Sequence, residues 1–168
     1  APGQAAAFDG EYVIMHPTNA EATKRGIWPT EGWHALGRAL HEAFALPVLV
    51  SGTSADAPIV AQITSDGVTS IAGALGIGAF GALAQRARAF VGITTGTMHV
   101  AAAVGCPTVG IFPFQSDFPD RWAPLGARTA VVRPSFPCHS GDTKESCADY
   151  ACVGALDVER IVGAACRV

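Results

Sequence analysis

The chain has 168 residues, which fits one globular domain, and its residues are 49% hydrophobic and only 15% charged, against roughly 25% charged in an average domain. The net charge of −3 excludes a basic field of the kind that holds nucleic acid or an anionic membrane. Any phosphate must therefore be bound locally, by backbone N–H groups and a few well-placed side chains.

Short strand-like and helix-like runs alternate along the chain, the pattern of successive βαβ units. Strands that end in turn signals are predicted at residues 12–15, 47–50, 68–72, 90–93 and 108–112. Helices are predicted from near Pro29 to residue 44, and at residues 57–64, 78–88, 97–104 and 157–165. The order predicts a Rossmann-like three-layer α/β/α domain with a mostly parallel sheet. Ligands bind such sheets at the loops after the carboxyl ends of the strands, so those loops are the candidate sites.

The apolar stretches, the start of the chain and the cysteines indicate where in the cell the protein is located. The longest apolar stretches, residues 74–84 and 98–114, fall short of the ~20 residues that a membrane span needs. The chain opens without Met and without a charged segment before an apolar run, so we predict no secretory signal and expect a fragment. Five cysteines favour a reducing cytoplasm over a complete disulfide framework. We expect residues 1–10 to be a linker or a cloning remnant and residues 11–168 to be the domain.

One segment joins a predicted strand to a predicted helix with small hydroxyl residues and a glycine, Thr94-Thr95-Gly96-Thr97-Met98-His99. Such residues let backbone N–H groups approach an anion, and the start of a helix adds partial positive charge. The segment is therefore a candidate diphosphate cradle. Thr95 and His99 are one helical turn apart, so the imidazole can donate to the same ligand. The alternative is an N-cap threonine and a structural histidine.

Two earlier loops carry charged residues. Lys24 and Arg25 come before the first predicted helix and can reach a phosphate, or they are solvated loop charges. The loop after the second strand contains Thr53 and ends at Asp56. The Asp56 carboxylate can accept hydrogen bonds from ribose hydroxyls, or it caps the next helix.

A third segment, residues 76–81, matches the G-x-G-x-x-G pattern of dinucleotide-binding domains. A nicotinamide-dependent oxidoreductase is therefore a rival hypothesis. That pattern requires an acidic residue ~20 positions further on, but the first acidic residue after it is Asp117. The alternative is that these glycines let helix and sheet pack closely. A non-catalytic nucleotide-binding module is a second rival, because a lone Rossmann-like domain can hold a nucleotide without turning it over.

Cysteine and histidine residues gather near the C-terminus, at Cys138, His139, Cys147 and Cys152. The spacing of Cys147 and Cys152 is compatible with one side of a zinc site. Adjacent residues such as Cys138 and His139 rarely both bind one metal, so reduced thiols or a local disulfide are the alternatives.

The chain as a whole resembles the second domain of glycosyltransferase family 9, the heptosyltransferase-like enzymes. The matching runs span nearly the whole chain in the family's order: His16-Pro17, Lys24, Trp28-Pro29-x-Glu31-x-Trp33, Ser51-Gly52, Ile71-Ala72-Gly73, Val91-Gly92, Thr95-Gly96-x-Met98-His99-x-Ala101-Ala102-Ala103, Cys106-Pro107 through Phe112, and Arg121-Trp122-x-Pro124.

The resemblance implies the C-terminal, donor-binding half of a two-domain GT-B enzyme. Such enzymes transfer a sugar with inversion from a nucleotide diphosphate, commonly ADP-heptose, to a lipopolysaccharide core or another lipid-linked or oligosaccharide acceptor. The general base lies in the N-terminal domain, so no catalytic residue is expected here and the fragment alone is expected to be inactive. The resemblance implies no required cofactor or metal. It also implies a cytoplasmic enzyme, peripheral at the inner membrane when complete.

The resemblance also assigns roles to residues. Lys24, His99 and the amides of residues 95–98 would stabilise the leaving diphosphate, Thr18 would add a hydroxyl contact, Asp56 would face the ribose and Leu75 the adenine. The full donor-binding set that we expect is Thr18, Asn19, Lys24, Arg25, Thr53, Asp56, Leu75, Thr94, Thr95, Gly96, Thr97, Met98 and His99.

The sequence departs from the family pattern in three places. Thr94 stands where the family has an aspartate, and Thr18-Asn19 replaces Gly-Ala. Two extra residues, Gly26 and Ile27, precede Trp28-Pro29, so Lys24 and Arg25 compete for the phosphate role. These departures leave the donor sugar open.

Overall fold

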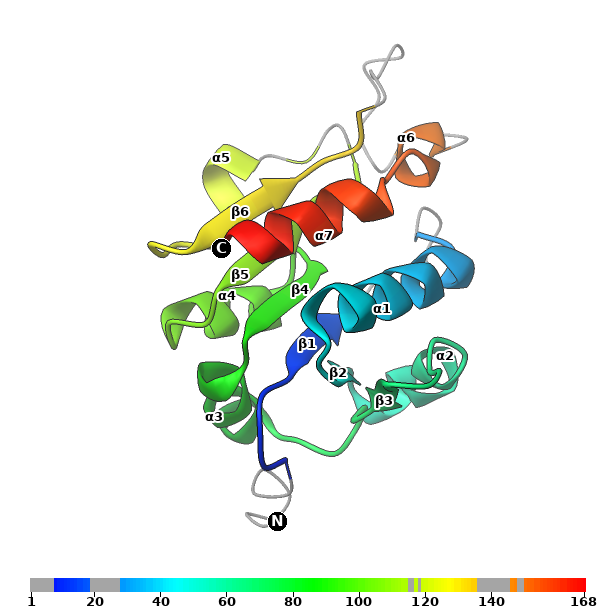
Figure 1. The fold of residues 1–168 in the computed structure, drawn as a ribbon. Coiled ribbons are helices and arrows are strands. Elements are labelled where there is room, and N and C mark those ends of the chain that lie inside the picture. The colour runs from blue at the N-terminus through cyan, green and yellow to red at the C-terminus, as the bar shows by residue number, and fades with distance from the viewer. Residues whose placement is uncertain (1–7, 19–27, 115–116, 118, 136–145, 148–149) are drawn as a thin grey trace.

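The computed structural model describes residues 8–18, 28–114, 117, 119–135, 146–147 and 150–168. Its centre is a six-stranded sheet in the order β3-β2-β1-β4-β5-β6 (Figure 1). Every neighbouring pair is parallel. The strands are β1 (Val13–His16), β2 (Val48–Val50), β3 (Val68–Ser70), β4 (Ala89–Ile93), β5 (Thr108–Ile111) and β6 (Thr129–Val132).

Helices cover both faces of this sheet, as Figure 1 shows. The helices are α1 (Thr30–Phe44), the 3₁₀ helix η2 (Ser54–Asp56), α2 (Ala57–Ala61), α3 (Ile77–Arg86), α4 (Gly96–Ala103), α5 (Pro119–Trp122), α6 (Ala151–Gly154) and α7 (Val158–Arg167). Helices α1, α2, α6 and α7 pack in one hydrophobic cluster, and α3 and α4 pack in a second. The predicted three-layer, Rossmann-like domain with a parallel sheet is thereby confirmed.

Successive residues of the strands point to opposite faces, which builds the two cores. Val13 and Met15 of β1 belong to the first cluster, whereas Tyr12 and Ile14 belong to the second. Both faces of the central strands are therefore buried, as parallel sheets require.

All the predicted strands and helices are present, with ends shifted by a few residues. The predicted strand at 68–72 ends at Ser70, because the Ala72 N–H turns back to the Ser70 hydroxyl (3.3 Å). Gly73 follows with φ +74°, a value that suits glycine. The predicted helix at 57–64 ends at Ala61, where a Gln62 N–H bond to the Ile59 carbonyl tightens the last turn.

Four elements were not predicted: β6, η2, α5 and α6. The three helices span one turn or less, too few residues for a helical period to emerge. Strand β6 is as long as β1 and β5, but only its last residue is buried. None of the helices in the described ranges is long and apolar enough to cross a bilayer.

The strand order fixes where a ligand is expected. Strands β2 and β3 lie to one side of β1, and β4, β5 and β6 lie to the other. The order therefore reverses between β1 and β4, and open α/β sheets bind ligands outside the carboxyl ends of the strands at this switch point.

Candidate functional site

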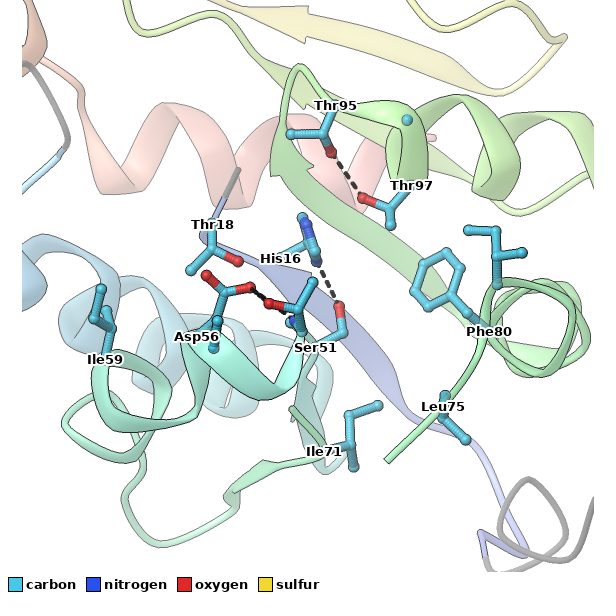
Figure 2. Close-up of a pocket in the computed structure, with 15 residues that line it drawn as sticks. His16, Thr18, Ser51, Asp56, Ile59, Ile71, Leu75, Phe80, Thr95 and Thr97 are labelled. Carbon is cyan, nitrogen blue, oxygen red and sulfur yellow. Dashed lines mark hydrogen bonds between the residues drawn. The ribbon is translucent and has the colours of Figure 1, made fainter. Parts of the chain in front are cut away.

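A cavity of about 680 Å³ lies at the carboxyl edge of the sheet, beside the switch point between β1 and β4 (Figure 2). The loops that follow β1, β2, β3 and β4 form its walls. Its lining residues are His16, Thr18, Ser51, Gly52, Thr53, Ala55, Asp56, Ile59, Ile71, Leu75, Ile77, Phe80, Thr95, Gly96 and Thr97.

His16, at the end of β1, occupies the middle of the cavity floor. Its Nδ1 lies 2.9 Å from the Ser51 hydroxyl, and its ring stacks on Phe90. The ring is only 7% exposed, and this burial lowers its pKa from 6.5 to about 4, although the Asp56 carboxylate and backbone hydrogen bonds with Thr18 and Ser51 oppose the shift. His16 is therefore a neutral, fixed part of the floor near neutral pH.

Thr18 follows β1 and supplies a buried hydroxyl to the cavity. The residue is 2% exposed, yet its Oγ1 has no hydrogen-bond partner among the described residues. A Cβ added at Gly52 would lie 3.4 Å from this oxygen, so the glycine leaves the space beside it open. Because an unpartnered buried hydroxyl costs free energy, its presence at a cavity indicates a polar ligand.

Asp56 holds the loop after β2 in place. Its Oδ2 accepts hydrogen bonds from the Thr53 N–H (2.7 Å) and the Thr53 hydroxyl (2.6 Å). The carboxylate thus closes a capping box at the start of η2. It makes no cap hydrogen bond at the start of α2, so the predicted alternative, a cap on the next helix, was wrong. Asp56 also lines the cavity, where its remaining lone pairs can accept from ligand hydroxyls.

The start of α4 supplies the other polar wall. Thr95 and Thr97 place their hydroxyl oxygens 2.7 Å apart, and an added Cβ at Gly96 would meet no atom within 4 Å. The Met98 N–H is bonded to the Thr95 carbonyl (3.1 Å), whereas Gly96 and Thr97, the first two residues of α4, have no carbonyl four residues earlier in the helix to receive their N–H groups. Both residues line the cavity, so the amides and the dipole at the start of this helix are available to an anion there.

The segment from residue 71 to residue 80 forms the opposite side, and its lining side chains are apolar. In Figure 2, Leu75 and Phe80 lie across the cavity from Thr18 and Asp56. Phe80 packs edge-to-face on Phe90 of β4. The cavity is thus polar along the β1, β2 and β4 loops and apolar along residues 71–80.

The structure brings many of the predicted donor-binding residues to this cavity and leaves others away from it. The predicted residues that line it are Thr18, Thr53, Asp56, Leu75, Thr95, Gly96 and Thr97. Thr94 and His99 are half-buried outside the lining, and the Met98 side chain is fully buried in the α3–α4 core. Asn19, Lys24 and Arg25 lie outside the described residues.

The prediction did not place several lining residues in the donor site, including His16, Ser51, Ile71, Ile77 and Phe80. His16 and Ser51 end or follow predicted strands, so the rule about carboxyl edges is the signal that finds them. Ile77 and Phe80 lie within the G-x-G-x-x-G segment, where the pattern directs attention to the glycines.

Packing in the described structure does not require those glycines. An added Cβ at Gly76 or Gly78 meets nothing within 4 Å, and one at Gly81 would lie 3.5 Å from Val100 of α4, an ordinary contact distance. The suggestion that these glycines let helix and sheet pack closely was therefore wrong.

Two of the four predicted zinc ligands lie within the described residues. Cys138 and His139 lie outside the described residues. Cys147 accepts a hydrogen bond from the Tyr150 N–H (3.3 Å), and Cys152 is buried in α6. Among the described residues, no three His, Cys, Asp or Glu side chains are placed to hold a metal, so the zinc hypothesis stays a prediction.

Comparison with known proteins shows what this chain is similar to in sequence and in fold. The model of glycosyltransferase family 9 (heptosyltransferase) matches residues 2–150. Lipopolysaccharide heptosyltransferase 3 of Escherichia coli is 31% identical over 106 residues, which cover 60% of this chain and 31% of that protein.

Two solved structures share the fold. E. coli ADP-heptose lps heptosyltransferase II superposes with a TM-score of 0.70 at 21% identity, over 92% of this chain and 45% of that one. E. coli heptosyltransferase WaaC with ADP superposes with a TM-score of 0.63 at 18% identity, over 74% of this chain and 38% of that one. The chain therefore spans less than half the length of these relatives.

Proposed function

The chain belongs to glycosyltransferase family 9, the heptosyltransferase family, and from this premise we propose that it is the donor-binding half of a glycosyltransferase. The observation that carries the proposal is the cavity at the switch point. The Thr18 hydroxyl, which is buried without a partner among the described residues, and the first two amides of α4 are available there to a polar ligand. The ligand that fits this arrangement is a nucleoside diphosphate sugar.

The diphosphate would lie against the start of α4. The Gly96 and Thr97 amides would donate to its oxygens, and the absence of a side chain at Gly96 allows the close approach. The Thr18 hydroxyl would donate to the same group. These fixed dipoles would stabilise the negative charge that develops on the leaving diphosphate, since they are oriented before the reaction begins.

Two further side chains would add to this stabilisation. His99 lies on α4 one turn beyond Thr95 and can donate from outside the cavity lining. Lys24, or Arg25 in its place, would supply a positive charge. A metal ion is not required in this scheme, because the amides and cations together meet the charge of the diphosphate.

The two remaining walls of the cavity indicate where the ribose and the adenine would lie. Asp56 faces the cavity with lone pairs that would accept from the ribose hydroxyls. The adenine of an ADP-sugar would lie toward Leu75 on the apolar side. One similar solved structure, WaaC, contains ADP, which supports an adenine nucleotide as the ligand.

We further propose that the transferred sugar is a heptose or related hexose, that the acceptor is a lipopolysaccharide core or another lipid-linked or oligosaccharide glycan, and that the transfer inverts the anomeric carbon. The general base that activates the acceptor would come from an N-terminal domain, across the cleft of a GT-B enzyme. Such an enzyme would act in the cytoplasm, at the inner face of the inner membrane.

Calorimetry on the 168-residue chain tests this proposal. ADP is expected to bind at one site, and the chain alone is expected to transfer no sugar from ADP-heptose to an acceptor. Addition of the N-terminal domain should restore transfer. ADP binding without transfer by the complete protein would favour the alternative, a non-catalytic nucleotide-binding module. Turnover by the chain alone would show that the general base lies within these residues.

A further inference from the structure

We infer that the outer end of the sheet carries a second surface, which docks this chain on an anionic phospholipid bilayer. The surface consists of three exposed apolar side chains, Trp122, Leu125 and Val131, and two exposed arginines, Arg121 and Arg128. We call it the edge patch. It goes beyond the proposed function, because none of its residues lines the donor cavity.

A buried proline holds the edge patch in place. Pro124 is buried, and an added Cβ at Gly110 of β5 would lie 3.3 Å from its Cδ, so the proline ring covers the β5 backbone. Val131 of β6 is paired with Gly110 and therefore points to the same face of the sheet. Trp122 and Leu125 flank Pro124 in the chain. The three apolar side chains thus gather around one proline at the outermost strand of the sheet (Figure 1).

The apolar side chains of the edge patch are open to solvent. Leu125 is 84% exposed, Trp122 51% and Val131 37%. The two other tryptophans of the chain, Trp28 and Trp33, are buried in the core. Neighbouring exposed apolar side chains on a folded domain mark a surface that binds a partner.

The composition of the edge patch fits the interface of a bilayer. Tryptophan has an apolar body and a polar N–H, and it is enriched at the level of lipid headgroups. The Arg121 Cζ lies 5.2 Å from the centre of the Trp122 ring, which places a guanidinium beside the indole. Arg128 adds a second cation, whereas residues 119–131 contain one acidic residue, Asp120. The patch is therefore apolar with a positive rim, which suits anionic headgroups.

A second copy of the chain fits the edge patch less well. In a two-fold symmetric dimer the same surface meets itself, so two positive rims would be brought together. A bilayer with anionic lipids offers hydrocarbon and negative charge instead. The net charge of the chain, −3, gives no long-range attraction to such a bilayer, so insertion of the apolar side chains would supply most of the affinity.

Docking through the edge patch would leave the donor site accessible. The patch lies at the end of the sheet that β6 forms, whereas the donor cavity lies at the carboxyl edge beside β1 and β4. The cavity would therefore stay open to an acceptor while the chain is bound to lipid. A lipid-linked acceptor, as proposed above, would share the same membrane surface.

Cosedimentation of the 168-residue chain with lipid vesicles tests this inference. Vesicles of phosphatidylcholine and phosphatidylglycerol should bind the chain, and vesicles of phosphatidylcholine alone should bind it at least about fivefold more weakly, because arginines near an anionic surface add to the affinity. Since Trp122 is the exposed tryptophan, binding should shift the fluorescence to shorter wavelength, and brominated lipid should quench it.

Substitutions in the edge patch sharpen the test. Trp122→Ser and Leu125→Ser should each lower the partition constant about tenfold, because each removes an apolar side chain from the inserted surface. Arg121→Gln should lower it about fivefold on anionic vesicles. Arg38→Gln is the matched control: Arg38 is 60% exposed on α1, where it pairs with Glu42, so its loss should leave the partition constant within about twofold of the parent.

Trp122→Phe separates the probe from the affinity. The variant keeps an aromatic side chain, so it should bind vesicles within about threefold of the parent. Its fluorescence should no longer be quenched by brominated lipid, because the two remaining tryptophans are buried.

Several outcomes would overturn this inference. They are a lack of sedimentation with anionic vesicles, binding in which brominated lipid leaves the fluorescence unchanged, and parental affinity in a folded Trp122→Ser protein. Dimerisation that Leu125→Ser abolishes, without vesicle binding, would assign the edge patch to a second copy of the chain. None of these measurements involves ADP, so a failure here leaves the donor site standing, and failure of ADP to bind leaves the edge patch standing.

Discussion

Two helices, α3 and α4, begin in glycine-containing segments at the carboxyl edge of the sheet, yet they contribute differently to the cavity. The start of α4 supplies Thr95, Gly96 and Thr97, with two hydroxyls and the first amides of the helix. The start of α3 contains a G-x-G-x-x-G pattern, but the residues of it that line the cavity, Ile77 and Phe80, have hydrocarbon side chains.

Glycines at the start of a helix are therefore not enough to predict an anion site there. Helix α4 follows the central strand β4, which is paired to β1 at the switch point, whereas α3 follows the edge strand β3. A helix that starts beside the switch point directs its amides at the ligand. In this account α4 binds the diphosphate and α3 contacts the nucleobase.

The largest expected effect comes from Gly96→Val. Its branched side chain would extend into the space that the diphosphate occupies, so ADP affinity should fall at least about hundredfold as the hydrogen bonds to charged oxygens are lost. Calorimetry gives the affinity. An added Cβ at Gly96 meets no protein atom within 4 Å, so the fold should survive, as circular dichroism can verify.

Gly78→Val is the matched control, because an added Cβ at Gly78 also meets nothing within 4 Å and Gly78 lies outside the cavity lining. Its ADP affinity should stay within about threefold of the parent, since no contact to the diphosphate is removed. If Gly78→Val abolishes binding and Gly96→Val does not, the roles of α3 and α4 are reversed.

Thr18→Val should have the next largest effect. The substitution keeps the shape but removes a hydroxyl that is buried with no partner in the part of the chain that the structure describes. The unliganded protein should therefore melt at the same temperature or higher. ADP affinity should fall by about 1.5–3 kcal/mol, the range for a hydrogen bond to a charged group. Unchanged affinity in Thr18→Val would remove this hydroxyl from the site.

His99→Ala tests whether α4 contacts the ligand beyond its first turn. We expect ADP to bind more weakly by about 1.5 kcal/mol, the lower end for a hydrogen bond to a charged group, because His99 lies outside the cavity lining. His99→Gln should recover part of the affinity, since the amide is also a donor. Lower melting temperature with parental affinity would show that His99 is structural.

The smallest effect on affinity is expected from pH, through His16. Burial lowers the pKa of His16 to about 4 in the folded chain, from 6.5, so the ring stays neutral and should add no step to ADP affinity between about pH 6 and 8. The free energy of unfolding depends on pH instead. Below the ordinary pKa, His16 is protonated in the unfolded chain but stays neutral in the folded chain. The free energy of unfolding therefore falls by up to about 3 kcal/mol toward pH 4.

Urea unfolding at several pH values measures this loss, with His16→Asn as the comparison. The variant should show a flatter decline between about pH 6.5 and 4, because it lacks the titrating group. Parallel declines in both proteins would mean that His16 is not held neutral by the fold.

The sequence predicted most of the fold because each long strand ends at a clear turn. Gly73 and Thr94-Thr95-Gly96 mark such ends and place the following helices. Strand β6 (Thr129–Val132) was not predicted, although it is as long as β1 and β5. It forms the outer edge of the sheet and only its last residue is buried, so packing with α7 decides the conformation.

The site was predictable where polar residues follow strands, as at Thr18, Asp56 and Thr95. It was not predictable where the fold decides which side of a helix faces the cavity. Met98 and Thr97 are neighbours, yet Met98 packs under Gly110 and Thr97 lines the cavity. Ile77 was not predicted to line the site, because an apolar residue is not recognised as a ligand contact until its exposure in the folded chain is known.

The most direct test of the central claim is an ¹⁵N–¹H NMR titration of the 168-residue chain with ADP. If α4 cradles the diphosphate, the amide signals of Gly96 and Thr97 should shift, and the dissociation constant from their shifts should equal the calorimetric one. If ADP binds while those two amides remain unmoved, the diphosphate lies elsewhere and the assignment of α4 is contradicted.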